Sequence, residues 1–363
     1  MTVVAARAPR PWPWGPVVGI AGLLVTAVGF VLDPQQAYAS WLTALAAGLS
    51  VALGVVMLIA IAHVSGARWF DPLRGLALNV AGTMPLFGLL FLVLLSGIGQ
   101  LYPWVHASGR ANAAWLSVPW FVVRAAVYFA IWIAVSLLLR RWAGPDLDAT
   151  PGPPSSRERA LAAIALPALG LSLTFAGFDW LMSLSPDWVS TAFGVYWFAG
   201  GFVGALALVA VLAAVGGMGA TRAPIVLGPR QAYALGALML TFAIFWAYIA
   251  YSQYFIIWIA NVPAEVAWYI PRLRGGWGAL ALVVLVGQFL LPLLVLLIQA
   301  AKLSPRVVGA IAALVLVMHY LDTYWLVLPA VHPDAPHPHW LDLSALAAVG
   351  GTAAGWTSWL ARR

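Results

Sequence analysis

The stretch FWAYIAYSQYFIIWIANVPAE, residues 245–265, decides how the chain folds. Its apolar part is long enough to cross a bilayer, because about 20 residues of helix span the hydrocarbon core. It also carries Tyr248, Tyr251 and Gln253 within two helical turns. A polar amide in lipid is costly, so we expect Gln253 to face the interior of a helix bundle. The stretch therefore predicts a membrane span whose inner face is polar.

The whole chain has the composition of that stretch. Of its 363 residues, 63% are hydrophobic and only 8% are charged, whereas about a quarter of an ordinary globular chain is charged. We therefore predict an all-α polytopic membrane protein. The net charge of +7 is explained by basic loops at the membrane surface, so no nucleic-acid partner is needed. The absence of cysteine excludes disulfides, thiolate ligation of iron–sulfur clusters and covalent c-type haem within this chain.

Hydrophobic runs predict about ten spans in a single integral membrane domain, residues 1–363. The first run is longer than the apolar core of a signal peptide, about 7–15 residues, so we expect it to be retained as a span. Asp179 and Asp322 each lie about two helical turns before the outer end of their spans, four spans apart. This echo predicts two four-helix bundles, spans two to five (41–184) and six to nine (190–328), with one flanking helix at each end of the chain (15–32 and 341–360). The predicted spans are 15–32, 41–63, 76–97, 118–139, 160–184, 190–215, 231–259, 277–299, 306–328 and 341–360.

The basic residues predict an orientation. Of the 18 Lys and Arg residues, all but Arg110, Arg124, Arg272 and Arg274 fall on the side of the N-terminus. Because cytoplasmic loops carry the excess of positive charge, we expect both termini in the cytoplasm. Arg272 and Arg274 oppose this bias, which favours a contact with an acidic partner surface.

Four polar groups lie at a similar depth in the outer half of their spans, Arg124, Asp179, Gln253 and Asp322, and His319 lies one helical turn deeper than Asp322. Arg124 and Asp179 would neutralise each other if they pair, but the remaining groups need partners of their own. His319 and Asp322 share a helix face, three residues apart. We expect the group to converge on a ligand headgroup or a proton relay.

Four further motifs are assigned structural roles. His63 lies at the cytoplasmic end of span two and His319 at another depth, so no haem is expected between them. The loop VHPDAPHPHW (331–340) contains His332, Asp334, His337 and His339, which have the composition of a zinc site, but proline-stiffened loops often look like this without a metal, and we predict none. Asn261 is expected to cap a short helix that begins near Pro263, with Glu265 in its first turn. Gly200 and Gly204, four residues apart, predict close helix packing.

Two longer motifs carry a family resemblance. YSQYFIIWIANVPAE (251–265) and FAGFDWLMSLSPDWVSTAFGVYWFAGGFV (175–203), together with the ten-span layout, resemble the NrfD-like quinone-binding subunit 2 of alternative complex III, a bacterial quinol:cytochrome c (or other high-potential acceptor) oxidoreductase. The resemblance extends from about His63 to Asp342. Ala264 stands where the family pattern has the first of two acids, so Glu265 is alone there.

The resemblance implies a subunit of the bacterial inner membrane without covalently bound cofactors. It implies partners as well: haem c subunits, an iron–sulfur subunit and a paralogous NrfD-like membrane subunit, besides quinone and lipids. On this reading Arg124 holds a carboxylate or a quinone oxygen, and His319 with Asp322 accepts or relays protons, while Tyr248, Tyr251 and Gln253 line the cavity. The residues alone leave two alternatives open: a secondary transporter with a buried charged site, and a purely structural anchor.

Overall fold

The computed structural model describes residues 14–107, 113–143, 154–216 and 227–362. Within these ranges the regular secondary structure is entirely helical, and nine helical segments are long and apolar enough to cross a membrane. A tenth helix, α16 (Trp340–Leu360), completes the set. The predicted all-α polytopic membrane protein with about ten helices is thus confirmed. Among the arginines used to predict the orientation, Arg7, Arg10, Arg110, Arg222 and Arg363 lie outside the described residues.

The spanning segments vary in regularity. Two of them are interrupted: one between α3 and α4, and one by a π-helical segment, η4, between α12 and α13. The nine spanning segments contain α1 (Trp14–Leu32), α2 (Pro34–Ser65), η1 (Arg68–Leu73) with α3 (Arg74–Ala81) and α4 (Met84–Ser96), α6 (Val118–Trp142), α7 (Ser156–Trp180), α8 (Phe193–Ala214), α9 (Pro229–Ala260), α12 (Gly275–Val284) with η4 (Leu285–Leu290) and α13 (Leu291–Leu296), and α15 (Pro305–Val327); α16 is the additional long helix. The short elements are α5 (Ile98–Leu101), η2 (Pro103–Val105), η3 (Met182–Leu184), α10 (Pro263–Val266), α11 (Tyr269–Arg272), α14 (Gln299–Leu303) and η5 (Leu328–Ala330).

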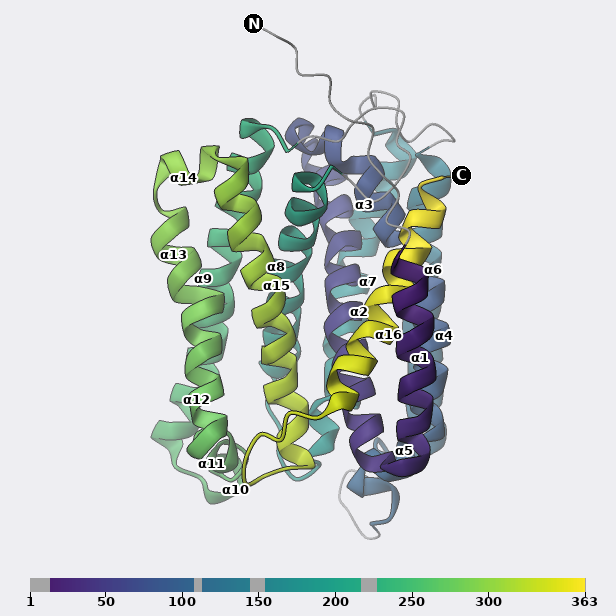
Figure 1. Cartoon of the computed structure of the whole chain (residues 1–363), viewed down its shortest axis with the longest axis vertical. Coiled ribbons are helices and arrows are strands. Elements are labelled where there is room, and N and C mark those ends of the chain that lie inside the picture. The colour runs from purple at the N-terminus through teal and green to yellow at the C-terminus, as the bar shows by residue number, and fades with distance from the viewer. Residues whose placement is uncertain (1–13, 108–112, 144–153, 217–226, 363) are drawn as a thin grey trace, which may run out of the picture.

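The helices form two groups that meet along α2 and α8 (Figure 1). Helix α2 packs with α3, α4 and α7, and α6 joins them; α8 packs with α9 and α15, against which α12 and α13 lie. Small residues let the two central helices approach closely. A Cβ added to Gly54 would lie 2.7 Å from the Cβ of Ala205, and one added to Gly201 would lie 2.6 Å from the Cβ of Ser50. Close backbone approach of this kind is how membrane helices associate.

The first and last spanning helices pair with each other. Helix α16 crosses α1 obliquely, yellow against purple in Figure 1, and also contacts α2. A Cβ added to Gly19 would lie 2.6 Å from the backbone nitrogen of Thr352, and one added to Gly22 would lie 2.3 Å from that of Ala348. These positions therefore require glycine, because the backbones of the two helices touch there.

Local sequence fixes several helix ends. The side chain of Asp33 caps α2 by accepting a hydrogen bond from the backbone of Gln36 at 3.3 Å, and Ser155 forms a capping box with Glu158 at the start of α7. Asn261 does not cap the helix that follows it. It ends α9 in the left-handed conformation, φ 49°, which asparagine tolerates better than most residues. Helix α10 does begin at Pro263 with Glu265 in its first turn.

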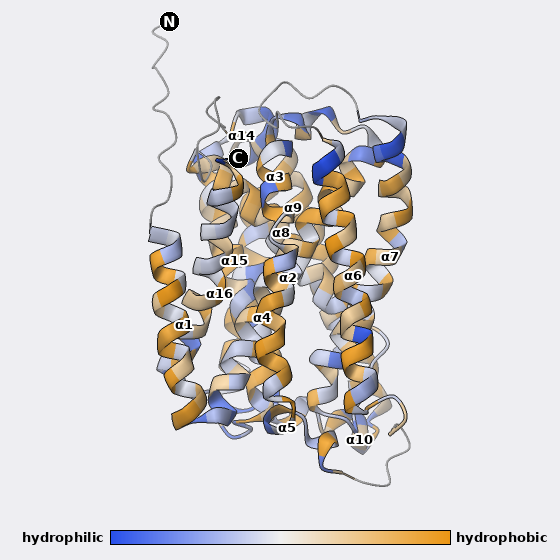
Figure 2. Ribbon diagram, turned by 90° about the vertical axis from the view of Figure 1, so that its right-hand side faces the viewer, coloured by the Kyte–Doolittle hydropathy of each residue, from blue (hydrophilic) through white to orange (hydrophobic). Residues whose placement is uncertain are grey.

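Polarity is concentrated at the two ends of the bundle. Apolar residues dominate the middle of the helices, and hydrophilic residues gather beyond them (Figure 2). Several arginines lie at the end where α1 begins and α16 ends, including Arg140 and Arg141 at the end of α6 and Arg74 at the start of α3. This asymmetry is the pattern expected of a membrane protein with a preferred orientation.

Candidate functional site

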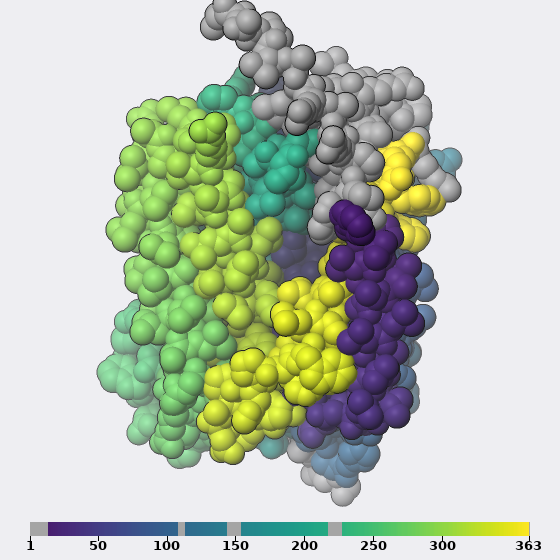
Figure 3. Space-filling view, in the orientation of Figure 1, coloured from purple at the N-terminus to yellow at the C-terminus, as the bar shows by residue number. Residues whose placement is uncertain are grey.

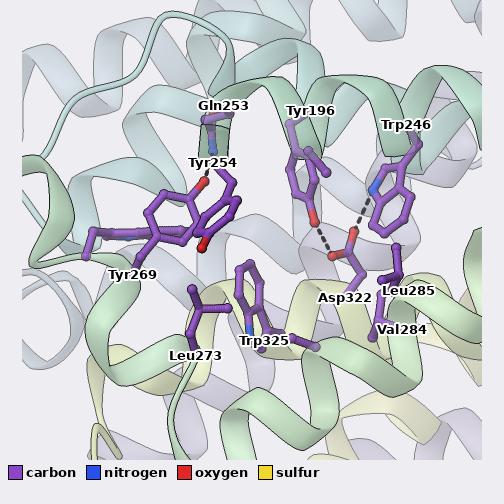
Figure 4. A pocket seen from close by; sticks show the side chains of 13 residues that line it. Tyr196, Trp246, Gln253, Tyr254, Tyr269, Leu273, Val284, Leu285, Asp322 and Trp325 are labelled. Atoms are coloured by element: carbon purple, nitrogen blue, oxygen red, sulfur yellow. Dashed lines mark hydrogen bonds between the residues drawn. The ribbon is translucent and has the colours of Figure 1, made fainter. Parts of the chain in front are cut away.

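A cavity of about 340 Å³ lies in the second group of helices. It is enclosed by α8, α9, α11, α12 and α15 (Figure 4), at the end of the bundle opposite the start of α1 and the end of α16 (Figure 1). Its walls are mainly aromatic and aliphatic, with a few polar groups, which is the usual lining of a small-molecule site. The lining residues are Tyr196, Trp246, Ala250, Gln253, Tyr254, Trp268, Tyr269, Leu273, Ala281, Val284, Leu285, Asp322 and Trp325.

Asp322 supplies the carboxylate of this cavity. It projects from α15 and is only 3% exposed. Its Oδ1 accepts a hydrogen bond from the hydroxyl of Tyr196, and its Oδ2 accepts one from Nε1 of Trp246 at 3.2 Å (Figure 4). Within the described ranges no Lys or Arg pairs with Asp322. Neutral donors thus hold a buried carboxylate at the wall of an apolar cavity, where a ligand can offer it a proton.

Gln253 organises the opposite wall. Its Oε1 accepts a hydrogen bond from Ser190 at 2.8 Å, and its Nε2 donates one to the hydroxyl of Tyr269 at 3.0 Å. Burial raises the pKa of Tyr269 to about 12, so the phenol keeps its proton at neutral pH. Because this hydroxyl accepts from Gln253, its own proton is available to a second acceptor. The hydroxyl of Tyr254 is turned toward the cavity in Figure 4.

Apolar residues form the mouth of the cavity. Leu273 and Leu285 line it and are 45% and 41% exposed, so the cavity reaches the outer surface of the helices. Leu285 is also the first residue of the π-helical segment η4. Such segments often occur at functional sites because they displace side chains from the regular helical register. The mouth is thus suited to an apolar tail.

Arg272 is buried and makes hydrogen bonds within the chain. The expectation that it contacts an acidic partner surface is therefore wrong. It is 3% exposed, its guanidinium lies 3.8 Å from the ring of Trp268, and it donates to the backbone carbonyls of Trp268 at 2.9 Å and Leu326 at 3.0 Å. Burial lowers the pKa of Arg272 to about 9. The residue therefore ties α11 to α15 and holds one wall of the cavity. Arg274 is exposed.

The prediction that Tyr248 and Tyr251 line the cavity is wrong. Their side chains are 62% and 61% exposed, so they face away from the bundle. The inward face of α9 carries Trp246, Gln253 and Tyr254 instead, at positions i, i+7 and i+8, which share one side of a helix. The predicted depth of the two tyrosines along α9 was right, but the predicted side of the helix was wrong.

His319 lies one turn deeper than Asp322, beside a second cavity. It is 3% exposed, and its Nε2 lies 2.9 Å from the hydroxyl of Ser50, which also donates to the carbonyl of Ala47 at 3.1 Å. Nε2 is therefore the donor, and Nδ1 is a free acceptor without a partner in the described structure. The second cavity, about 320 Å³ and largely apolar, lies between α2, α8, α15 and α16, where Figure 3 shows the surface hollowed.

Gly200 of α8 lies next to both Nδ1 of His319 and the carboxylate of Asp322. A Cβ added to this residue would lie 3.1 Å from Nδ1 of His319 and 3.4 Å from Oδ2 of Asp322, and one added to Gly204 would lie 3.3 Å from the His319 ring. The predicted close packing at Gly200 and Gly204 thus serves α15 and its histidine as well as α2. His319 and Asp322 therefore both pack closely against Gly200 of α8.

Arg124 and Asp179 form a separate, closed cluster in the first group of helices. Arg124 donates to both carboxylate oxygens, at 2.7 and 2.8 Å, and Tyr128 donates to Oδ2 at 2.8 Å. Nε1 of Trp115 donates to Oδ1 at 3.0 Å, and the Trp115 ring lies 4.1 Å from the guanidinium. Arg124 thus holds a carboxylate, as predicted. The prediction that all these polar groups converge is wrong. They lie at a similar depth, but they form two separate clusters in different groups of helices.

The histidine-rich loop makes structural hydrogen bonds. Nε2 of His332 lies 2.6 Å from Oε1 of Gln36, and His339 caps α16 together with Asp342. Within the described ranges no three His, Asp or Glu side chains converge as metal ligands. Asp334 and His337 therefore join no such group.

The cavity also contains residues that sequence reasoning missed: Tyr196, Trp246, Tyr254, Trp268, Tyr269 and Trp325. Tyr254 lies near the outer end of α9, where tyrosines commonly belong to the aromatic belt of the membrane interface, so its position in the sequence did not indicate a cavity. Comparison with known proteins finds no family model that matches the chain and no match among the curated proteins.

Proposed function

We propose that the chain is an NrfD-like membrane subunit of a quinol-oxidising complex and that the cavity beside Asp322 holds the quinol headgroup. The observation that carries this proposal is the combination of an aromatic cavity, a buried carboxylate without a cationic partner in the described structure, and phenol groups on the facing wall. Flat aromatic walls suit a quinone ring by stacking. The apolar mouth at Leu273 and Leu285 suits its isoprenoid tail.

Proton transfer is the chemical task of this chain in the proposal. Oxidation of a quinol releases two electrons and two protons. The electrons pass to the iron–sulfur and haem c centres of partner subunits, since this chain has no cysteine to ligate such a centre. Asp322 accepts the protons one at a time from the quinol hydroxyls, while Tyr254 and Tyr269 orient the ring by hydrogen bonding.

His319 is the next acceptor in the proposed path. Its Nδ1 has no partner in the described structure, and both this atom and Oδ2 of Asp322 lie close to Gly200. A proton that leaves Asp322 can protonate Nδ1 and make the ring a cation, which then releases the proton towards the second cavity. In the proposal the complex lies in the bacterial inner membrane with both termini of this chain in the cytoplasm, beside a paralogous NrfD-like subunit.

Photolabelling tests the site directly. A short-chain quinone with a photoreactive group is expected to label peptides of α9 and α12 in the purified protein, and excess unlabelled quinone should suppress the labelling. Filling the cavity with Ala281→Phe should weaken labelling by about tenfold, which corresponds to about 1.4 kcal/mol of binding. Ala279→Phe is the matched control, because Ala279 is exposed on the same helix. Equal labelling of the two variants would refute the proposed site.

A second pair of variants tests the contact itself. Tyr254→Phe removes a hydroxyl that faces the cavity, whereas Tyr251→Phe removes one that faces outward. Only the first should weaken quinone binding, by about 0.5–1.5 kcal/mol for one neutral hydrogen bond. The transporter alternative makes a different prediction: liposomes containing this chain alone would take up a charged solute, and quinone would not compete.

A further inference from the structure

A third cavity, of about 390 Å³, lies at the other end of the bundle, near the chain termini. It is bounded by the end of α2, by η1, by the start of α3 and by the first turn of α7. Its lining differs from that of the other two cavities because it is strongly polar. The lining residues are Ala62, His63, Gly66, Ala67, Arg68, Phe70, Asp71, Arg74, Pro154 and Arg159.

Two buried side chains in this wall lack hydrogen-bond partners. His63 is 3% exposed, and in the described structure neither of its ring nitrogens has a partner. Arg74 is 7% exposed; it donates through Nη2 to Glu158, but its Nε has no partner in the same described ranges. Buried polar groups are almost always paired with protein, water or ligand. Because both residues line the cavity, a ligand bound there is in a position to supply the missing partners.

The charges around the cavity select the kind of ligand. Arg68, Arg74 and Arg159 line it, against a single lining carboxylate, Asp71. Glu158 neutralises Arg74 from outside the cavity and is itself held by the capping box of α7. Positive charge is thus in excess, even with Asp71 and Glu158 counted. Arg68 and Arg159 are exposed, so an anion can reach the cavity from the membrane surface.

We infer that this cavity binds a phosphate group. Arginine presents a fork of donors that matches phosphate oxygens, and such pairs are among the strongest charge-assisted hydrogen bonds. His63 adds a further buried hydrogen-bonding group to the lining. The phosphate belongs either to the headgroup of an anionic lipid, for which basic pockets between membrane helices are known binding sites, or to a free phosphate compound. This site is independent of the quinone proposal, since it lies in the other group of helices and shares none of its residues.

Thermal unfolding of the purified full-length protein tests the inference. Inorganic phosphate, titrated at constant ionic strength with chloride, should raise the melting temperature along a saturable curve, as expected for a ligand that binds only the folded protein. The double variant Arg68→Gln/Arg159→Gln changes two exposed side chains, so it should fold normally. Its apparent affinity for phosphate should fall by about tenfold or more, because two of the three lining arginines are lost.

The control is Arg306→Gln, which removes an exposed arginine outside the cavity and should leave the affinity within about twofold. The same variants in phosphatidylcholine nanodiscs, with and without phosphatidylglycerol, distinguish the two sources of the phosphate group. Stabilisation by the anionic lipid but not by inorganic phosphate assigns the site to a lipid headgroup. Stabilisation by phosphate itself assigns it to a free phosphate compound. The inference is overturned if neither probe raises the melting temperature, or if Arg306→Gln weakens the effect as much as the double variant, which would indicate general surface charge.

Discussion

Neutralising the two buried aspartates should have opposite consequences, and the reason lies in their partners. In Asp322→Asn, the amide oxygen can accept from Trp246 while the amide nitrogen donates to the hydroxyl of Tyr196, which rotates to accept. The same two pairs of residues then remain hydrogen-bonded, although the bond with Tyr196 reverses its direction. The free energy of unfolding should change by no more than about 1 kcal/mol, the net value of one neutral hydrogen bond.

Asp179→Asn should be far more damaging to the fold. All four contacts to its carboxylate are donors: two from Arg124, one from Trp115 and one from Tyr128. Whichever oxygen the amide nitrogen replaces, it faces an Arg124 N–H that cannot accept, even though the hydroxyl of Tyr128 can rotate, and the charge of Arg124 loses its partner. Breaking a buried ion pair of this kind costs about 3–5 kcal/mol.

Activity should follow the reverse order. If Asp322 accepts the quinol protons, its replacement should lower quinol oxidation by the assembled complex by about 100-fold or more, since general bases contribute about 10²–10⁴-fold. Asp179→Asn should lower activity only in proportion to the folded protein that remains. The assay pairs thermal unfolding in mild detergent with the turnover of a soluble quinol. The reasoning is refuted if Asp322→Asn unfolds as readily as Asp179→Asn, or if it turns over at the wild-type rate.

Three further predictions concern the proton path, the histidine loop and the partners. Gly200→Ala should slow turnover while the protein stays folded, because the new methyl would lie 3.1 Å from His319 and 3.4 Å from Asp322; Gly170→Ala, with open space around it, should have no effect. Burial, assisted by a neighbouring histidine, lowers the pKa of His332, so below about pH 6.5 the unfolded chain binds the proton more readily and stability should fall with pH; melting temperatures between pH 7 and pH 5 should show this slope, and His332→Asn should flatten it. Purification in mild detergent should bring haem c and iron–sulfur subunits with this chain, visible as a Soret band that is absent from the chain expressed alone; a chain that always purifies alone would favour the transporter.

Hydropathy predicted the spans well because crossing a membrane leaves a one-dimensional signal. Residues 118–139 were predicted for the helix that runs from Val118 to Trp142. The interrupted third span was predicted as 76–97, but it begins with η1 at Arg68 and breaks after Ala81. Its arginines and Asp71 made that first turn look like a loop.

The site was predicted only in part, because depth along a helix can be read from the sequence but direction around it cannot. Asp322 and Gln253 were predicted correctly, because a charged or amide side chain within a span is costly in lipid and therefore faces the interior of the bundle. Tyr254 and Tyr251 differ by three positions, and which of them faces inward depends on where the neighbouring helices lie. Arg124 shares its depth with Asp322 but belongs to the other group of helices, which only the packing of α2 against α8 reveals.

The pairing of α1 with α16 sets an order of events during synthesis. About 300 residues separate the end of α1 from the start of α16, so at about 5–20 residues per second the ribosome needs roughly 15–60 s between them. During that interval α1 lies in the bilayer without α16, and the glycines that will later contact α16 are exposed to lipid. A chain that stops before Trp340 therefore leaves α1 with only its smaller contact to α2 inside the described structure.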